Sequence, residues 1–210
     1  MEKWIIKIEQ WFPIHIGYVY NPFHKEIEDD LTQQCLKIKK TYKKDSDQFQ
    51  KEEFNNLSSS PLLNWYQFQK HKISYMLLKD QKFSRLHDWI DDQINLYIEQ
   101  LEFTTGKLKC NEGWFNVYEK YEFTDYHNHI PNVVSCVYFL NCTEPNSAAK
   151  LLIKNKSSND YSSYSKLFPS YMCYNQDPGK LVIFSSTLDH AVQQHNTDDL
   201  RITLAYNFDQ

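Results

Sequence analysis

The chain has 210 residues, of which 41% are hydrophobic, and its formal charge of −4 argues against broad nucleic-acid binding. It contains four glycines and neither a G-x-x-x-x-G-K-S/T nor a G-x-G-x-x-G motif, which argues against a glycine-rich phosphate site. No apolar run approaches the ~18 residues that a membrane-spanning helix needs, and the first ten residues are too polar for a secretory signal.

The first half of the chain predicts one strand and two helices. Residues 11–20, WFPIHIGYVY, alternate as a strand does. From residue 24 to about residue 44, apolar residues recur every three or four positions, which indicates one face of a helix. The polar segment 45–61 predicts a loop, and a stronger helical pattern covers residues 82–101.

The second half changes to short strands. Five segments are rich in β-branched or aromatic residues and are separated by turn residues: GWFNVYEK, VVSCVYFLN, AKLLIKN, GKLVIFSS and RITLAYNF. Helices followed by strands indicate an α+β protein, mainly β, with helices packed outside an antiparallel sheet structure. The Tyr- and Ser-rich segment 154–176 predicts a long loop, which is either a functional lid or a surface insertion.

The five cysteines are odd in number and include no C-x-x-C pair. They predict free, mostly buried thiols in a reducing compartment such as the cytoplasm.

Two of the eight histidines lie two residues apart in DYHNHIP, residues 125–131. If this segment is extended, Asp125, His127 and His129 point to the same face, because side chains alternate along a strand. Two imidazoles on one face can bind a single metal ion at ~2.0–2.2 Å. The polar outer face of an edge strand would give the same pattern, so the pair alone leaves both interpretations open.

The C-terminal part adds a third histidine and an arginine. His190 follows an apolar strand, and Arg201 begins the final strand eleven residues later. Arg201 shares one face of that strand with Thr203, Ala205 and Asn207, while the alternate residues are apolar or aromatic. An arginine is awkward in an apolar core, but it can pair bidentately with a carboxylate.

In this order the motifs resemble the Fe(II)- and 2-oxoglutarate-dependent dioxygenases, in particular the prolyl-hydroxylase-like, uncharacterised oxygenases of bacteria and phages. The resemblance covers residues 110–208 and rests on Trp114–Asn116 (W-x-N), HNHIPNVVS, YFL, PGKLVIF, HAV and RIT. It implies a single domain with the double-stranded β-helix, or jelly-roll, fold. Residues 1–106 would supply the first strand and helices packed on one sheet, and residues 107–210 the β-helix core.

The resemblance also implies an activity. An enzyme of this kind uses Fe(II), O2 and 2-oxoglutarate to hydroxylate a C–H bond of a small-molecule or peptide substrate, and it releases succinate and CO2. Arg201 would pair with the far carboxylate of 2-oxoglutarate, helped by Thr203 and by Tyr118 or Tyr138. The segment 154–176 would be the lid.

By matching position, His127 and His190 would be iron ligands, but His129 stands where the family places a carboxylate. Three alternatives follow. His129 is the third ligand, or Asp125 supplies the carboxylate. In the third, His129 does not bind the iron but lies behind the ligands or faces the substrate, and an exogenous ligand joins the two protein ligands. Halogenating relatives have a small residue at this position, so the imidazole argues against halogenation.

Two other functions remain open. The absent carboxylate favours a non-catalytic metal- or ligand-binding β-barrel. A cupin-like dioxygenase with three histidines and no 2-oxoglutarate is the other, but such an enzyme has no need of Arg201 as a carboxylate partner.

Overall fold

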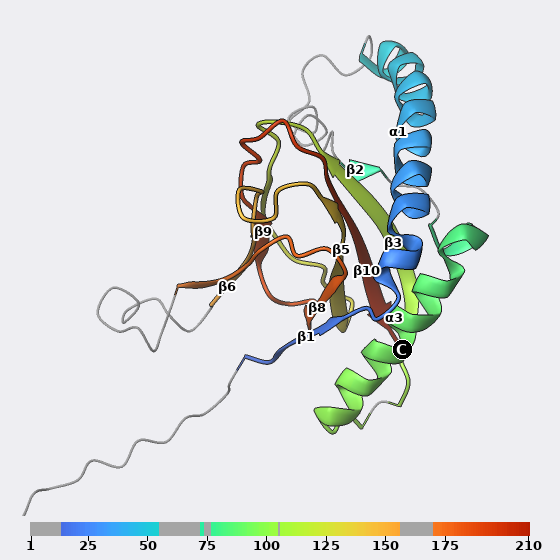
Figure 1. Ribbon diagram of the computed structural model, residues 1–210. Helices are drawn as coiled ribbons and strands as arrows, with labels where there is room; N and C mark the ends of the chain where they lie inside the picture. The colour runs from blue at the N-terminus through green and yellow to red at the C-terminus, as the bar shows by residue number, and fades with distance from the viewer. Residues whose placement is uncertain (1–13, 55–71, 74–76, 105, 156–169) are drawn as a thin grey trace, which may run out of the picture.

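A computed structural model of the protein describes residues 14–54, 72–73, 77–104, 106–155 and 170–210, with the backbone alone given for residues 41–54 and 72–73. In these residues, ten strands form two antiparallel sheets, and helices cover the outer face of the larger sheet (Figure 1). The molecule therefore has three layers: helices, a large sheet and a small sheet.

The larger sheet has six strands. Their order is β1 (Ile16–Tyr20), β8 (Lys180–Ser185), β5 (Val134–Cys142), β10 (Arg201–Asp209), β3 (Lys109–Tyr118) and β2 (Lys72–Ile73). The central strand β10 pairs along its length with both β3 and β5. Side chains of β10 therefore point alternately toward the helices and toward the smaller sheet.

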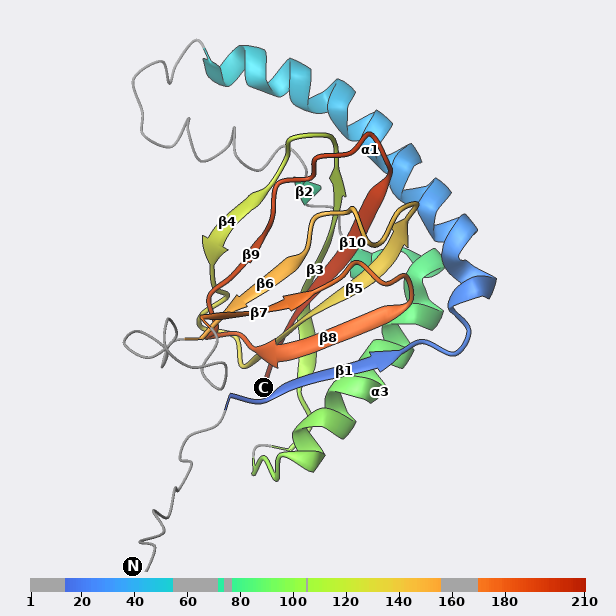
Figure 2. The same ribbon diagram turned by 60° about the vertical axis from the view of Figure 1, so that its left-hand side comes forward.

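The smaller sheet has four strands and faces the larger one (Figure 2). Their order is β4 (Thr124–His127), β9 (His190–Val192), β6 (Leu151–Lys154) and β7 (Tyr171–Tyr174). A buried apolar cluster joins the two sheets: Phe139, Leu151, Ile153, Val182, Phe184 and Leu188. This arrangement is the double-stranded β-helix that the sequence resemblance implied.

Helix α3 (Ser84–Gln100) confirms the helix predicted over residues 82–101. Leu86, Ile90, Ile94 and Ile98 repeat every four residues and are buried, because that spacing forms one stripe on a helix. The stripe belongs to the core between the helices and the larger sheet. Two short 3-10 helices, η1 (Leu77–Lys79) and η2 (Gln81–Phe83), precede α3.

Helix α1 (His24–Phe54) is longer than the sequence pattern predicted. The loop predicted for residues 45–61 was wrong for residues 45–54, which continue the helix. Eight of these ten residues are polar, none is Gly or Pro, and Lys, Gln and Glu are good helix formers. No helix in the described part of the chain has both the length and the apolar composition needed to cross a membrane.

The long loop predicted over residues 154–176 was wrong at its ends. Lys154 is the last residue of β6, and Tyr171–Tyr174 form β7, which pairs antiparallel with β6. Residues 156–169, where the predicted lid would lie, are outside the described residues.

Candidate metal centre

The structure brings three histidines together from two strands and one loop. His127 ends β4 and His190 begins β9, and the two residues face each other across the antiparallel pair. His129 lies two residues beyond β4, where its backbone N–H donates to the carbonyl oxygen of Ser186 at 2.9 Å. The potential ligand atoms of the three imidazoles all lie within 4.8 Å of one another.

Backbone carbonyl groups fix which ring nitrogens face the centre of this cluster. The Nδ1 atom of His127 lies 2.8 Å from the carbonyl oxygen of Asp125, and that of His190 lies 3.0 Å from the carbonyl oxygen of Leu188. A carbonyl oxygen only accepts, so each Nδ1 carries the proton and donates. Each Nε2 is then left with a lone pair, which is the state that binds a metal ion.

The spacing of the nitrogens fits one metal ion. The Nε2 atoms of His129 and His190 lie 3.2 Å apart. If both bound one ion at ~2.1 Å, they would subtend an angle of about 100° at it, between octahedral and tetrahedral values. Burial, and the neighbouring His127, lower the pKa of His190 to about 3, so its ring is neutral at physiological pH.

Aromatic rings hold two of the imidazoles in place. The Trp114 ring centroid lies 5.3 Å from that of His129, and the Phe184 ring meets His190 edge-on at 4.8 Å. Trp114 and Phe184 are both buried. Their packing restricts the rotation of the histidine rings and walls the cluster with apolar surface.

Asp125 lies outside the cluster. Its side chain is exposed, and its Oδ1 accepts the backbone N–H of Tyr126 at 2.7 Å. The pairing of β4 with β9 is irregular between Thr124 and His127, and both of these side chains line the same cavity. The expected alternation is broken at this bulge, so Asp125 does not share a face with His127. In the described residues, no Asp, Glu or Cys joins the three histidines as a potential ligand.

Arg201 lies between the sheets with no exposed surface. Its Nε donates to the carbonyl oxygen of Ala149 at 3.1 Å, and its guanidinium carbon lies 4.2 Å from the centre of the Tyr118 ring. Its Nη1 is buried without a hydrogen-bond partner, and no carboxylate among the described residues forms an ion pair with it. A buried cation with an unused donor is costly, so this site favours an anion.

One cavity of about 240 Å³ joins Arg201 to the histidines. Polar residues line it beside Arg201: the Asn116 amide donates to the Thr203 hydroxyl at 3.3 Å, and the Tyr118 and Thr124 hydroxyl groups lie 2.8 Å apart. Trp114, Asn116 and Thr124 were not among the site residues predicted from the sequence. Trp114 and Asn116 precede Tyr118 at steps of two on β3, so strand alternation alone would have placed them on its face.

Tyr138 points away from this cavity, contrary to its expected place beside Arg201. Its hydroxyl group lies 2.8 Å from Nδ1 of His24 and accepts the side-chain amide of Asn21 at 3.2 Å. Tyr138 pairs directly with Leu204 of β10, which faces the helices, so Tyr138 packs into the helix-side core. Tyr118 and Thr203 line the cavity as expected.

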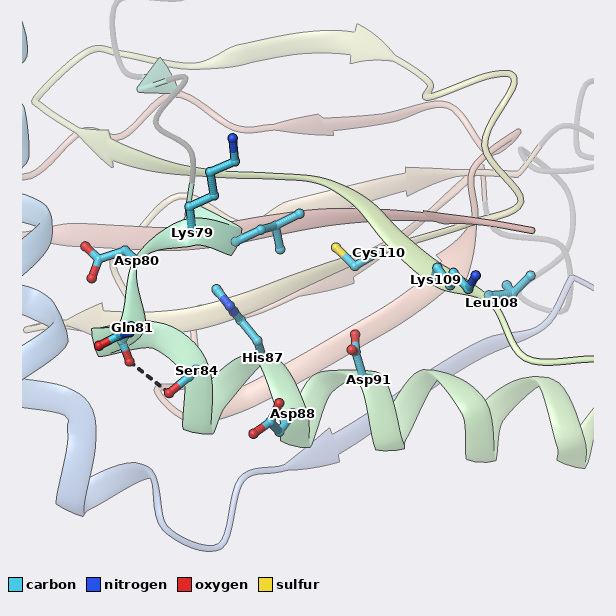
Figure 3. Close-up of a pocket in the computed structure, with 11 residues that line it drawn as sticks. Lys79, Asp80, Gln81, Ser84, His87, Asp88, Asp91, Leu108, Lys109 and Cys110 are labelled. Atoms are coloured by element: carbon cyan, nitrogen blue, oxygen red, sulfur yellow. Dashed lines mark hydrogen bonds between the residues drawn. The ribbon is translucent and has the colours of Figure 1, made fainter.

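A larger cavity of about 420 Å³ lies on the helix side of the larger sheet. Figure 3 shows His87 and Asp91 pointing from α3 toward the larger sheet, with Cys110 of β3 on the side of Asp91. Burial lowers the pKa of His87 to about 4, and burial together with Asp91 raises the pKa of the Cys110 thiol to about 12. This thiol stays protonated, and within the described residues only the three histidines lie close enough together to share a metal ion.

Comparisons with known proteins agree with this site. The model of the family described as "Putative 2OG-Fe(II) oxygenase" matches residues 112–207, which include all three histidines and Arg201. No curated protein matches the sequence.

Among solved structures, a prolyl-4-hydroxylase from Pseudomonas putida is 16% identical, with a TM-score of 0.56 over 94% of this chain and 88% of its own. AviO1 from Streptomyces viridochromogenes Tue57 is 13% identical, with a TM-score of 0.50 over 67% of this chain and 66% of its own. At these identities the two structures show a shared fold. Residues 112–207 of the chain therefore resemble the 2OG-Fe(II) oxygenase family.

Proposed function

We propose that the protein is an Fe(II)- and 2-oxoglutarate-dependent dioxygenase that hydroxylates a C–H bond of its substrate and releases succinate and CO2. The observation that carries this proposal is the buried Arg201, whose Nη1 has no partner, in the same cavity as three imidazoles. The histidines alone would fit many metal proteins. The buried guanidinium group of Arg201 favours a ligand that has a carboxylate far from the metal.

His127, His190 and His129 would hold the iron, each through Nε2. The separation of 3.2 Å between the Nε2 atoms of His129 and His190 supports His129 as the third ligand. Bound Fe(II) would supply the centre at which O2 and 2-oxoglutarate react. The chain's own contribution is to orient the ligands and to keep water out with Trp114 and Phe184.

Arg201 would bind the far carboxylate of 2-oxoglutarate. The Ala149 carbonyl group and the Tyr118 ring hold its guanidinium group in place before the ligand arrives, which lowers the cost of ordering it. Thr203 would add a hydroxyl contact on the same strand face. This arrangement favours an oxygenase that uses 2-oxoglutarate over a cupin-like dioxygenase that does not.

The substrate would be a small molecule, or a side chain of a peptide, that inserts one group into the cavity. At about 240 Å³, the cavity is below the ~300–1,000 Å³ typical of pockets that bury drug-sized ligands. Once 2-oxoglutarate is bound, most of a larger substrate would lie outside. The five free cysteines support a reducing compartment such as the cytoplasm.

The test uses the protein with Fe(II) and 2-oxoglutarate under anaerobic conditions. We expect the weak visible charge-transfer band of the iron chelate, and then succinate after O2 is admitted. A band without succinate would favour a binding protein without activity. The absence of both would refute the proposal.

A further inference from the structure

Within the described part of the chain, the cavity wall carries positive charge and no acidic side chain. None of the described residues that line it is Asp or Glu, and Arg201 is fully buried within it. The metal cluster adds three imidazoles and no carboxylate, because His129 stands where the resemblance places one. With a divalent ion bound, the formal charge inside would reach +3, and no described group of the cavity wall would offset it.

Two carboxylates hydrogen-bond to side chains of the cavity wall but are not part of its lining. Asp189 accepts the side-chain amide of Asn128 at 2.9 Å, and Glu112 accepts that of Asn207 at 2.9 Å. Glu112 is exposed and Asp189 is partly exposed, so water screens their charges. Charges inside the cavity are screened much less, which makes the repulsion between Arg201 and a bound ion significant.

We propose that 2-oxoglutarate, or a dicarboxylate of the same shape, is the counter-ion that lets this site hold its metal: the metal alone binds weakly, and the two load cooperatively. The inference rests on the proposed function and extends it to the dependence of metal binding on the diacid. The dianion offsets one of the two charges of the ion at one end and the charge of Arg201 at the other. By thermodynamic reciprocity, the metal raises the affinity for the diacid by the same factor.

Any ligand that chelates the bound metal ion raises the protein's affinity for that ion. The part of this increase that comes from charge therefore has to be measured separately. His129→Asp adds the missing carboxylate, and His129→Asn has nearly the same shape without the charge. For each protein, Co²⁺ affinity is measured by calorimetry with and without saturating 2-oxoglutarate. The ratio of the two affinities, here called the coupling factor, largely cancels the intrinsic strength of residue 129 as a ligand.

We expect a coupling factor of roughly 100-fold for the natural protein, at the upper end of typical allosteric values. His129→Asn should keep a similar factor, whereas His129→Asp should lower it at least about tenfold, because its carboxylate already offsets part of the metal charge. Equal factors for His129→Asp and the natural protein would overturn the inference. A natural protein that binds Co²⁺ equally well without the diacid would do the same.

A second measurement needs no variant at residue 129. Pyruvate chelates through the same 2-oxo acid group but has no second carboxylate to reach Arg201. It should therefore raise Co²⁺ affinity several-fold less than 2-oxoglutarate does, and this difference should vanish in Arg201→Ala. Equal effects of pyruvate and 2-oxoglutarate on the natural protein would contradict the inference. Coupled binding without succinate formation would leave the inference standing and refute only the proposed activity.

Discussion

Arg201 and Tyr118 face each other across strands β10 and β3, and the guanidinium carbon lies 4.2 Å from the centre of the Tyr118 ring. The ring is buried, and its hydroxyl group lies 2.8 Å from that of Thr124. The aromatic face offers the buried cation partial compensation without neutralising it. Arg201 is thereby held in position while its Nη1 stays available for a carboxylate.

Tyr118→Leu should weaken 2-oxoglutarate binding more than Tyr118→Phe does. A buried cation–π contact is worth about 1–2 kcal/mol, which corresponds to roughly a 5- to 30-fold rise in the 2-oxoglutarate KM. Phenylalanine keeps the ring and loses the hydroxyl group, with its contacts to Thr124 and Arg201. Steady-state succinate formation measures both variants, and equal KM values for the two would show that the ring face contributes nothing.

Arg201→Ala should raise the 2-oxoglutarate requirement steeply. Leaving the far carboxylate unpaired in a buried site costs ~3 kcal/mol or more, or at least about a 100-fold rise in KM. Metal affinity measured without 2-oxoglutarate should not fall, because Arg201 does not belong to the histidine cluster. Arg201→Lys keeps the charge but cannot form a bidentate pair with a carboxylate. Its KM for 2-oxoglutarate should therefore lie between those of the natural protein and Arg201→Ala. An unchanged KM in Arg201→Ala would refute the carboxylate contact.

In the presence of saturating 2-oxoglutarate, His127→Ala or His190→Ala should abolish stoichiometric Fe(II) or Co²⁺ binding, since each removes one of three ligands. The matched control is His15→Ala, because the His15 side chain is exposed and only its backbone carbonyl group is used, by the Tyr97 hydroxyl. Anaerobic metal titration followed by calorimetry is the measurement. Binding that survives both cluster substitutions would show that the metal lies elsewhere.

The sequence was most informative where chemistry or periodicity repeats locally. Helix α3 could be predicted because four apolar residues recur at steps of four, and the histidines stood out by their spacing and order. The direction of Tyr138 could not be predicted, because it depends on the register of β5 against β10, which residues far apart in the sequence determine. The position of Asp125 outside the histidine cluster could not be predicted either. It depends on an irregularity in the pairing of β4 with β9, two strands of four and three residues.

Ile94→Ala should destabilise the fold without altering the site. Ile94 has no exposed surface and lies in the core between α3 and the larger sheet, so its truncation should cost about 2–5 kcal/mol of unfolding free energy. Leu96→Ala on the same helix removes a side chain that is 49% exposed and should cost less than ~0.5 kcal/mol. Urea unfolding measures both, and similar losses for the two variants would contradict the packing described here.

The protein should lose stability in mild acid, partly through His87. This ring stacks on Phe83 and meets Tyr206 edge-on, and burial lowers its pKa from 6.5 to about 4. A histidine with a lowered folded-state pKa takes up its proton more readily when unfolded. Its contribution therefore favours the fold above pH 6.5 and is lost as the pH falls from 6.5 toward 4, at up to ~1.4 kcal/mol per pH unit.

His87→Phe keeps a ring in this position and removes the titration, so its unfolding free energy should fall less steeply across that interval. Urea unfolding at half-unit pH steps gives the two slopes, and parallel slopes would show that His87 does not contribute.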